Sequence, residues 1–372
     1  MKTVMLVFGT RPEAIKMCPL VKELQKRKNI KTVVAVTGQH RQMLDQVLKI
    51  FDVKPDYDLA IMKEKQTLFD ITVSVLGGIR KVIDDCRPDV VLVHGDTSTS
   101  FAAALAAFYM NVPVGHVEAG LRTYDIRSPY PEEFNREAVG IISNYNFAPT
   151  ETAKENLLRE GKKPDSIFVT GNTVIDALKY TYSESYSHPE LEWVGDSKLI
   201  LITAHRRENL DHLEDMFRAI KRVLDEHDDI KAIYPVHLNP VVRNAAAAVF
   251  GGDDRIHLID PLDVSDFHNF IGRSHLILTD SGGIQEEAPG FGIPVLVMRD
   301  TTERPEGIKA GTLRLVGTDE ETIYRNFKEL ITDRDAYMSM SNAVNPYGDG
   351  HACERISDIL FQHITPKYNK AY

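Results

Sequence analysis

Two kinds of hydrophobic pattern alternate along the chain. Short apolar runs bounded by polar or glycine-containing turns predict buried β-strands. The stretches between them carry apolar residues every three to four positions, which predicts amphipathic helices. The predicted strands lie at residues 2–8, 32–37, 89–93, 112–117, 146–148 and 167–170 in the first half, and at 198–203, 230–236, 256–259, 275–279, 294–298 and 313–316 in the second.

This alternation indicates the fold class. Strands that are each followed by a helix form parallel sheets with helices on both faces. We therefore expect an α/β protein with two Rossmann-like, doubly wound parallel-sheet domains and an interdomain cleft. The expected boundaries are 1–180 for the first domain, 181–197 for a polar hinge, 198–363 for the second domain and 364–372 for a tail. The helical pattern at 350–363 fits packing on either domain.

Length, charge and cysteine content narrow the class of protein. A chain of 372 residues exceeds what one hydrophobic core usually serves, which also favours two domains. The formal charge of −10 argues against nucleic acid or an acidic membrane as a partner, because the overall field repels both. No apolar run approaches the ~18 residues of a membrane span, and the first run is too short for a signal peptide. Three scattered cysteines without metal-type spacing fit a reducing, cytoplasmic location.

The stretch 279–307 carries the strongest candidate for a ligand site. Its strand ends in Asp280-Ser-Gly-Gly283, and a helix pattern begins directly afterwards, so backbone N–H groups there would face an anion. The next strand ends in a loop that carries Arg299 and Arg304. An ordinary helix cap explains the Ser-Gly-Gly turn alone, but the arginine loop beside it favours a site for nucleotide phosphates. We expect Glu286 and Glu287 to reach the same rim as a carboxylate pair.

Groups suited to proton transfer follow several other strands, where the carboxyl ends of a parallel sheet gather. They are Asp96, Glu118, the pair Glu132 and Glu133, and His205. Burial and a neighbouring like charge raise a carboxyl pKa, which lets such a group exchange a carbon-bound or hydroxyl proton near pH 7. Helix caps or salt bridges with Arg122, Arg136 or Arg207 explain each group singly about as well. Their joint placement after strands favours catalysis.

Basic residues near the same loops suit a diphosphate clamp. They are Arg11, Lys16, Arg206, Arg207 and Arg304. A metal site built from His94, Asp96, His116 and Glu118 is the alternative, but HEXXH and CxxC spacings are absent, so we expect no metal. Ser281 lies outside a G-x-S-x-G elbow, which disfavours a serine hydrolase. The first strand-to-helix turn has one glycine where a dinucleotide fingerprint needs three.

Eight motifs in order along the chain match one family. They read Gly9-Thr-Arg-Pro-Glu-Ala-Ile-Lys16, Thr37-Gly-Gln-His-Arg41, Val93-His-Gly-Asp-Thr97, Gly115-His-Val-Glu-Ala-Gly-Leu-Arg-Thr123, Pro131-Glu-Glu-Phe-Asn-Arg136, Thr203-Ala-His-Arg-Arg-Glu-Asn209, Asp280-Ser-Gly-Gly-Ile-Gln-Glu-Glu287 and Arg299-Asp-Thr-Thr-Glu-Arg-Pro-Glu306. In these motifs the chain resembles the non-hydrolysing UDP-N-acetylglucosamine 2-epimerases of bacteria. The likeness extends from the first strand to beyond residue 300.

The resemblance implies a glycosyltransferase-B-like architecture and a homodimer. It also implies interconversion of UDP-N-acetylglucosamine (UDP-GlcNAc) and UDP-N-acetylmannosamine (UDP-ManNAc) without a cofactor. In that family UDP is eliminated across C1–C2 to give 2-acetamidoglucal, and it is re-added with the opposite configuration at C2. The product would supply ManNAc units for cell-surface polysaccharide.

The resemblance also implies roles for individual residues. The catalytic residues would be Asp96, Glu118, Glu132 and His205, and the motifs leave open which carboxylate takes the C2 proton. Substrate and UDP would contact Arg11, Lys16, Arg136, Ser281, Gly282, Gly283, Glu287 and Arg304, with Glu287 on the ribose hydroxyls. Many members bind a second UDP-GlcNAc as an activator, through positions that match Gln39, Gln42, Lys65, Arg206 and His237. Lys65 stands where we expect arginine, so it keeps the charge but loses the bidentate fork.

Three alternatives stay open at this point. A hydrolysing relative would release free ManNAc and UDP, and a glycosyltransferase of the same fold would pass the sugar to an acceptor. The number of carboxylates argues against a transferase, which seldom needs so many for one acceptor. A UDP-sugar sensor would bind without turnover.

Overall fold

The computed structural model describes residues 1–38, 41–63 and 65–364. The chain forms two compact units. Unit 1 comprises residues 1–180 and the chain from residue 347 onward, and unit 2 comprises residues 181–346. The segment 181–197, expected as a hinge, belongs to unit 2 and contains helix α8 (Pro189–Val194). The last helix, α16 (Ala352–His363), belongs to unit 1.

Unit 1 is built on a parallel sheet of seven strands in the order β3-β2-β1-β4-β5-β6-β7. Its strands are β1 (Lys2–Phe8), β2 (Ile30–Val36), β3 (Tyr57–Asp58), β4 (Val90–His94), β5 (Val114–Val117), β6 (Tyr145–Ala148) and β7 (Ile167–Val169). The order reverses direction at β1, which pairs with both β2 and β4. Ligands of open parallel sheets bind outside the carboxyl ends of the strands at this kind of switch point.

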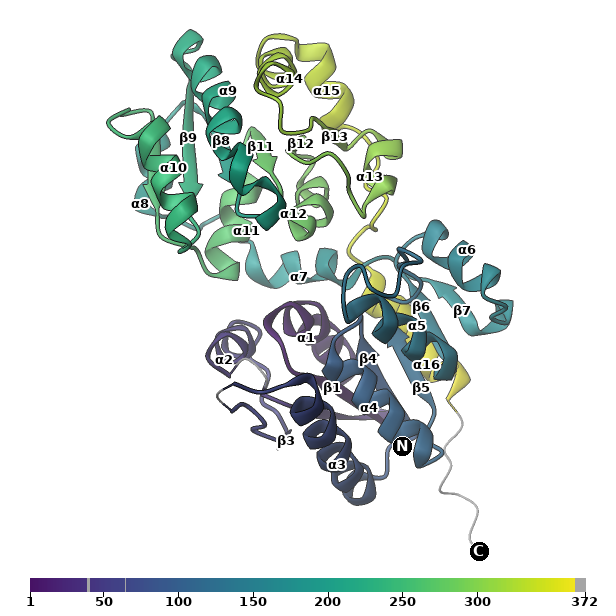
Figure 1. The fold of residues 1–372 in the computed structure, drawn as a ribbon. Helices are drawn as coiled ribbons and strands as arrows, with labels where there is room; N and C mark the ends of the chain where they lie inside the picture. Colours follow the sequence, from purple (N-terminus) through teal and green to yellow (C-terminus); the bar gives the residue numbers. More distant parts are fainter. Residues whose placement is uncertain (39–40, 64, 365–372) are drawn as a thin grey trace, which may run out of the picture. The chain divides into compact units, whose positions relative to one another are not determined.

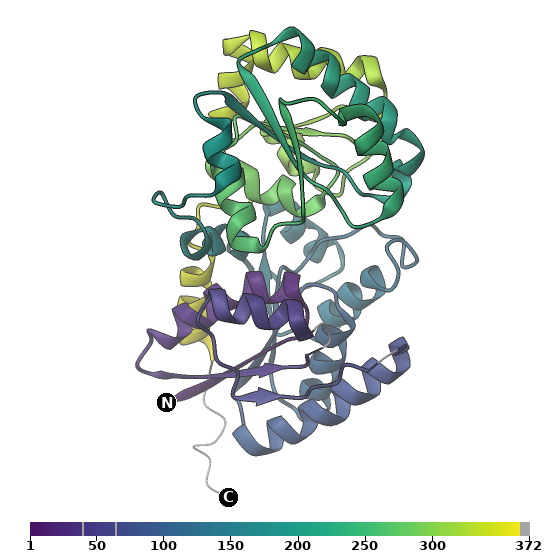
Figure 2. The same ribbon diagram turned by 90° about the vertical axis from the view of Figure 1, so that its left-hand side faces the viewer.

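Helices cover both faces of this sheet (Figures 1 and 2). Helix α1 packs against α2 and α16, while α3, α4 and α5 pack in a row. The helices of unit 1 are α1 (Arg11–Gln25), α2 (Arg41–Ile50), α3 (Leu68–Cys86), α4 (Ser98–Tyr109), α5 (Glu132–Ile142), α6 (Glu151–Arg159), the short 3₁₀ helix η1 (Pro164–Ser166), α7 (Thr173–Thr181) and α16. The small-residue helix α4 allows this close packing because its alanines are almost completely buried.

Unit 2 repeats the same topology with six parallel strands in the order β10-β9-β8-β11-β12-β13. Its strands are β8 (Lys198–Thr203), β9 (Ile230–Pro235), β10 (Ile256–Ile259), β11 (Leu276–Thr279), β12 (Val295–Val297) and β13 (Leu313–Leu315). Its helices besides α8 are η2 (Arg207–His212), α9 (Leu213–Glu226), α10 (Pro240–Phe250), α11 (Val264–Arg273), α12 (Gly282–Glu287), η3 (Ala288–Phe291), α13 (Pro305–Ala310), α14 (Glu320–Thr332) and α15 (Arg334–Ser341). The switch point of this sheet lies at β8, between β9 and β11.

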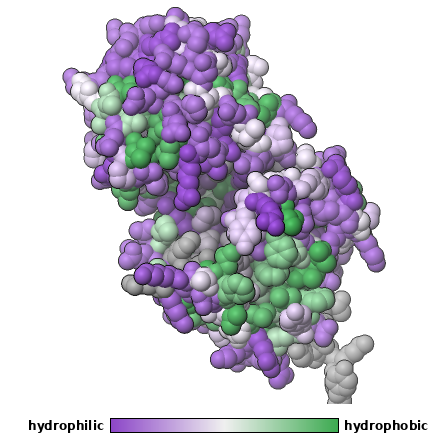
Figure 3. Space-filling model, in the orientation of Figure 1, coloured by the Kyte–Doolittle hydropathy of each residue, from purple (hydrophilic) through white to green (hydrophobic). Residues whose placement is uncertain are grey.

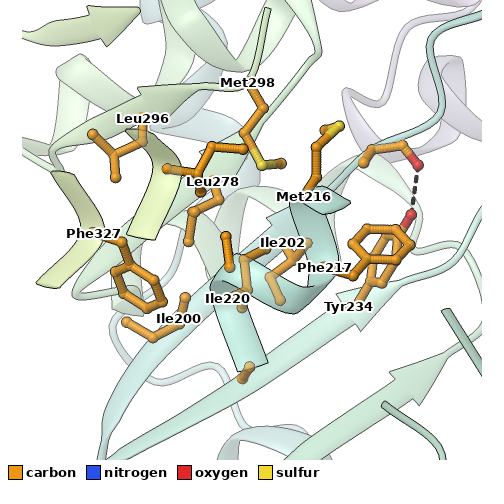
Figure 4. Packing of buried hydrophobic residues seen from close by; sticks show 14 of the residues in the cluster. Ile200, Ile202, Met216, Phe217, Ile220, Tyr234, Leu278, Leu296, Met298 and Phe327 are labelled. Atoms are coloured by element: carbon orange, nitrogen blue, oxygen red, sulfur yellow. Dashed lines mark hydrogen bonds between the residues drawn. The ribbon is translucent and has the colours of Figure 1, made fainter. Parts of the chain in front are cut away.

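Alternate residues of each central strand enter opposite cores of unit 2. Ile200 and Ile202 of β8 pack under α9 and α14, whereas Leu199 and Leu201 pack under α11 and α12. Figure 4 shows the first core, where Tyr234 lies beside Phe217. The Tyr234 hydroxyl donates to the carbonyl of Ala204. This bond satisfies a buried polar group directly below the loop that follows β8.

The fold class predicted from the hydrophobic pattern is confirmed, since both units are doubly wound α/β sheets with parallel strands throughout. The pattern missed β3, a strand of two residues that is too short for a period to appear. In the part of the chain that the structure describes, no helix is long and apolar enough to cross a membrane.

Candidate active site

The side chain of Glu13 joins the two loops at the switch point of unit 1. Its Oε2 accepts hydrogen bonds from the backbone N–H groups of Gly9 (3.0 Å) and Thr10 (2.8 Å) and from the Thr10 hydroxyl (2.8 Å). Its Oε1 accepts from the hydroxyls of Thr97 (2.6 Å) and Ser100 (2.9 Å). Glu13 is buried, so these five donors hold a carboxylate between the β1–α1 and β4–α4 loops.

Glu118 follows β5 and lies in a cluster of donors. Its Oε2 pairs with the Lys16 ammonium, accepts 3.0 Å from Asn172 Nδ2 and lies 3.6 Å from His94 Nε2. Burial by itself raises the pKa of Glu118, but Lys16 and His94 outweigh it and hold the pKa well below the ordinary value. Glu118 is therefore ionised, and its backbone adopts a left-handed φ of 64°. The structure brings together Lys16 and Glu118, which come from different motifs.

Asp96, after β4, is held by helix α5. The Arg136 guanidinium forms an ion pair with the Asp96 carboxylate, and Asn135 Nδ2 donates 2.8 Å to the Asp96 carbonyl. Arg136 also lies 3.1 Å from Glu133 Oε2. Glu132 begins this helix, one turn before the residues that hold Asp96. A salt bridge with arginine is the non-catalytic explanation that the sequence offers for Asp96, and this salt bridge is present. It also places Asp96 near Glu132, at the start of α5.

Glu133 supports a loop and is not exposed at the carboxyl ends of the strands, where the sequence predicts it. It is completely buried, and its Oε1 accepts 2.8 Å hydrogen bonds from the backbone N–H groups of Thr123 and Tyr124. The carboxylate thereby fixes the loop that precedes α5. Of the acidic pair expected at this point, Glu132 alone is left partly exposed.

His116 is a neutral, buried histidine. Its Nε2 lies 2.7 Å from the Gly95 carbonyl, and a carbonyl only accepts, so Nε2 carries the proton. Burial lowers the pKa of His116 to about 3. Among the described residues no group of three or more His, Cys, Asp or Glu side chains is arranged to hold a metal ion. The Lys16 ammonium forms an ion pair with the Glu118 carboxylate.

In unit 2, Asp280 joins the two loops at the switch point. Its Oδ2 accepts 2.8 Å hydrogen bonds from the backbone N–H groups of His205 and Arg206, and it accepts 3.3 Å from Asn209 Nδ2. Asp280 is completely buried. The loop after β8 is therefore clamped to the loop after β11, as Glu13 clamps the corresponding loops of unit 1.

Two guanidinium groups converge on Gly282, the first residue of α12. A Cβ added at Gly282 would lie 3.5 Å from Arg206 Nη2 and 3.5 Å from Arg304 Cζ. Arg304 is oriented by Glu286, whose Oε1 accepts 2.9 Å from Arg304 Nε. The Arg206 side chain forms no ion pair with another described residue. Positive charge and helical N–H groups thus face one small space, which is the chemistry of a phosphate site.

The remaining residues predicted for UDP in unit 2 lie on α12. Ser281 is its N-cap, and Gly283 would place a Cβ 3.3 Å from Glu287 Oε1. Glu287 Oε2 lies 3.5 Å from Nε2 of the buried His268. Glu286 and Glu287 do not form a carboxylate pair at the rim, because Glu286 is buried against Arg304 while Glu287 is partly exposed. Consecutive residues of an α-helix point about 100° apart, so the two side chains leave α12 in different directions.

His205 stacks on His237, with ring centroids 5.2 Å apart and planes 8° from parallel. Burial lowers the pKa of His205 below its ordinary value, although Asp280 opposes this shift. His205 is consequently neutral near pH 7, so one ring nitrogen carries a proton that it can donate and the other can accept one.

Arg299 is not available at the rim where the sequence placed it. It is buried, with Nε 3.0 Å from Glu208 Oε1 and Nη1 2.9 Å from Glu303 Oε2. These bonds fix the loop that carries Arg304, so Arg299 supports the guanidinium that faces Gly282. Arg11 is half-buried at the first position of α1 and Lys16 lies one turn further on.

The residues predicted for an activator fall in both units. Gln42 is exposed on α2, and Lys65 is exposed with a φ of 56°. Arg206 and His237 belong to unit 2, and Gln39 lies outside the described residues. Arg206 lies beside Arg304 at Gly282, so it shares the space predicted for phosphate.

Three further residues organise the site, although the sequence predicts no site role for them: Glu13, Asn172 and Asp280. Glu13 carries a signal, because Thr10-x-x-Glu13 is a capping box and such a glutamate folds back on the helix start. Asn172 and Asp280 carry none, since their partners are distant in sequence.

Two doubly wound sheets with charged loops at their switch points define a two-domain α/β protein of the glycosyltransferase-B-like class. The model of the UDP-N-acetylglucosamine 2-epimerase family matches residues 22–361, and the chain belongs to this family. It is therefore an isomerase.

Known relatives are similar over nearly the whole chain. UDP-N-acetylglucosamine 2-epimerase from Bacillus subtilis strain 168 is 62% identical over 361 residues, which are 97% of this chain and 95% of that protein. The enzyme from Neisseria meningitidis, solved bound to UDP-GlcNAc, has a TM-score of 0.87 and 47% identity and covers 97% of this chain and 100% of its own. The enzyme from Methanocaldococcus jannaschii, solved with UDP-GlcNAc and UDP, has a TM-score of 0.78 and 35% identity over the same shares.

Proposed function

We propose that this chain reversibly epimerises UDP-GlcNAc at C2 to give UDP-ManNAc, without releasing free sugar. The observation that carries this proposal is the convergence of Arg206 and Arg304 on Gly282 at the start of α12. A departing diphosphate needs fixed positive charge and N–H dipoles of this kind. The bound UDP-GlcNAc in the Neisseria meningitidis relative supports the choice of nucleotide sugar.

The proposed chemistry is an elimination followed by an addition. A carboxylate takes the C2 proton, the C1–O electron pair leaves with UDP, and a C1=C2 double bond gives 2-acetamidoglucal. UDP then re-forms the C1–O bond while C2 receives a proton on its opposite face. Removal from one face and return on the other need two proton-transfer groups. Unit 1 offers Asp96, Glu118 and Glu132 for these roles.

The surroundings of Glu118 suit a transient proton acceptor. Lys16 and His94 hold the pKa of Glu118 well below its ordinary value, so the carboxylate is ionised and can accept a proton, which it then gives up readily. This low pKa makes Glu118 a weaker base than the raised pKa expected from the sequence. In unit 2, we propose that Ser281, Gly282, Gly283 and Arg304 bind the diphosphate, that Glu287 binds the ribose hydroxyls and that His205 stays beside the phosphates. Arg11, Lys16 and Arg136 complete the set of substrate contacts from unit 1.

Incubation with UDP-GlcNAc in deuterated water tests the proposed reaction. We expect deuterium at C2 of intact UDP-GlcNAc and UDP-ManNAc, read by NMR and mass spectrometry. Free ManNAc with UDP would show a hydrolysing enzyme instead. UDP binding without any exchange would show a sensor, and sugar transfer that needs an acceptor would show a glycosyltransferase.

We also propose activation by a second UDP-GlcNAc through Gln39, Gln42, Lys65, Arg206 and His237. A lysine at 65 contributes a point charge where an arginine fork would bind phosphate through two bonds. The activation should therefore be weak, and Lys65→Arg should steepen the dependence of exchange rate on UDP-GlcNAc. An unchanged curve for this variant would remove Lys65 from the activator site. We further propose that the enzyme works in the cytoplasm. Its product would supply ManNAc units for cell-surface polysaccharide.

We propose that the chain is a homodimer that pairs through the outer face of α3, α4 and α5. This face carries exposed apolar side chains, Phe69, Val73, Phe108, Tyr109, Phe134 and Ile141. The rings of Phe101 and Phe134 join α4 to α5 at 5.6 Å, and Figure 3 shows apolar surface over these helices. An apolar surface of this kind is typical of an interface.

Light scattering after gel filtration tests the dimer. Val73→Glu should give a monomer, because it buries a charge in a self-complementary contact. The matched control is Val344→Glu, also at an exposed valine but in unit 2. A Val73→Glu protein that stays dimeric would move the interface elsewhere.

A further inference from the structure

Asn172 connects Glu118 to the point where the chain re-enters unit 1. It is almost completely buried between β7 and α7. Its Nδ2 donates 3.0 Å to Glu118 Oε2, its Oδ1 accepts 3.1 Å from the Val174 N–H, and its own N–H donates 2.7 Å to the Tyr347 carbonyl. One side chain therefore caps α7 and holds a carboxylate of the proposed acid–base set.

Two glycines let the returning chain approach Asn172 this closely. A Cβ on Gly171 would lie 3.3 Å from Gly348 Cα, and a Cβ on Gly348 would lie 3.5 Å from the Asn172 nitrogen. Both glycines have positive φ, 89° and 125°. The segments 171–172 and 347–348 are thus packed backbone against backbone, which leaves Asn172 little freedom to shift.

The contacts of Glu118 divide unequally between its two oxygens. Lys16, His94 and Asn172 all approach Oε2. Oε1 makes no hydrogen bond or ion pair with a described residue, and it lies 3.6 Å from the position of a Cβ on Gly95. Two donors, Lys16 and Asn172, fix Oε2, with His94 close beside it, and this directs Oε1 toward the space that Gly95 leaves open.

We propose that Asn172 is a positioning residue, which fixes Glu118 through Oε2 so that Oε1 is the oxygen that exchanges the sugar proton. This inference rests on the proposed acid–base function of Glu118. An amide is suited to this role because it donates a hydrogen bond without adding a charge. Its backbone bond to Tyr347 makes the orientation of Glu118 depend on the path of the returning chain.

Substitutions at 172 separate this role from helix capping. Asn172→Asp and Asn172→Ser both keep a side-chain oxygen that caps α7, because Asp and Ser are good N-caps. The Asp carboxylate has no hydrogen to donate to Glu118, and the Ser hydroxyl ends one atom short of the position of Asn172 Nδ2. We expect each to retain the melting temperature and KM while kcat for C2 exchange falls about 10- to 100-fold, the usual effect of a misplaced catalytic group. Asn172→Ala loses both functions, so its melting temperature should fall as well.

The pH profile gives a second readout. In Asn172→Asp a carboxylate faces Glu118 and raises its pKa, so the acidic limb of the kcat profile should move to higher pH. Asn172→Ser adds no charge, so the acidic limb of its kcat profile should move less. If Asn172→Asp fails to fold, the kcat of Asn172→Ser tests the positioning role by itself. The matched control is Asn156→Ser, which removes an amide that donates 3.0 Å to the Gly120 carbonyl of unit 1.

Each outcome supports or overturns the inference. Normal kcat and an unmoved pH limb in Asn172→Asp and Asn172→Ser would reduce Asn172 to a helix cap. A fall in kcat of the same size in Asn156→Ser would show a general effect of losing an amide. Absence of C2 exchange in the unsubstituted protein would instead overturn the proposed function itself.

Discussion

The Asp280 carboxylate accepts a 2.8 Å hydrogen bond from the backbone N–H of His205. This bond links the loop after β11 to the loop after β8 at the switch point of unit 2. The same carboxylate raises the pKa of the His205 ring against the effect of burial. Its negative charge thus influences both the position and the protonation of a proposed catalytic group.

Asp280→Asn should lower both stability and the pKa of His205. The variant loses a buried charge that accepts several hydrogen bonds, which costs about 2–3 kcal/mol. The pKa of His205 falls because the anion that raised it is gone. Urea unfolding and NMR titration of the ring protons measure the two effects. Asp254→Asn, at an exposed aspartate, is the control, and an unchanged His205 titration would contradict this account.

Glu13→Gln should destabilise unit 1 although it changes the shape little. In this variant an NH2 group replaces one of the two carboxylate oxygens. The backbone and hydroxyl groups that donated to that oxygen then face another donor and lose their hydrogen bonds. The expected loss is about 2–3 kcal/mol of unfolding free energy. Chemical denaturation measures it against Glu155→Gln on the exposed side of α6, which should change stability by no more than about 0.5 kcal/mol. Equal stability of the two variants would argue against the proposed clamp.

His116 should make stability depend on pH in the acid range. Its pKa is about 3 when folded and 6.5 in an unfolded chain. Between these values the unfolded chain binds the extra proton, so the contribution is complete above pH 6.5 and is lost as pH falls toward 3. One such proton gives a slope of up to about 1.4 kcal/mol per pH unit.

Urea unfolding between pH 7 and pH 4 tests this expectation. His116→Asn should flatten the slope, whatever its stability at neutral pH. His212→Asn is the control, because that histidine is exposed on the surface and its loss should leave the slope unchanged. Parallel slopes for the original protein and His116→Asn would refute the assignment.

Gly282→Ala should weaken UDP binding without unfolding unit 2. The new Cβ would be in ordinary van der Waals contact with Arg206 and Arg304, at 3.5 Å from each, so the fold accommodates it. It would nevertheless occupy the space proposed for phosphate oxygens. We expect a Kd for UDP that is about 10-fold higher by calorimetry, equivalent to ~1.4 kcal/mol. Gly77→Ala, whose Cβ meets nothing within 4 Å, should leave UDP binding intact, and equal Kd values would refute the site.

Glu118→Gln should bind UDP yet lose C2 exchange. Glutamine keeps the shape but takes no proton, and loss of a general acid–base group costs about 10²–10⁴ in rate. Deuterium exchange measures the loss and calorimetry measures retained binding. Near-normal turnover would remove Glu118 from the mechanism, whereas Glu155→Gln should behave like the original protein.

The sequence by itself determined the alternation of strands and helices, because buried parallel strands need continuous apolar runs and covering helices need an apolar stripe. It also placed Asp96, Glu118, His205 and Ser281 at the ends of strands. Strands joined by helices form parallel sheets, so the class of both sheets could be predicted, although the order of their strands could not. The capping box of Thr10 and Glu13 was visible in the same way, as a pattern spanning four residues.

Only the tertiary structure decided which of these groups touch. Lys16 pairs with Glu118 across 102 positions, and Asp280 holds His205 across 75. It also decided that α16 belongs to unit 1, that Glu133 and Arg299 are buried supports, and that Asn172 anchors Glu118. Periodicity records which face of an element is buried. It does not record which polar group a distant loop brings to that face, because such a contact depends on how whole sheets twist and stack.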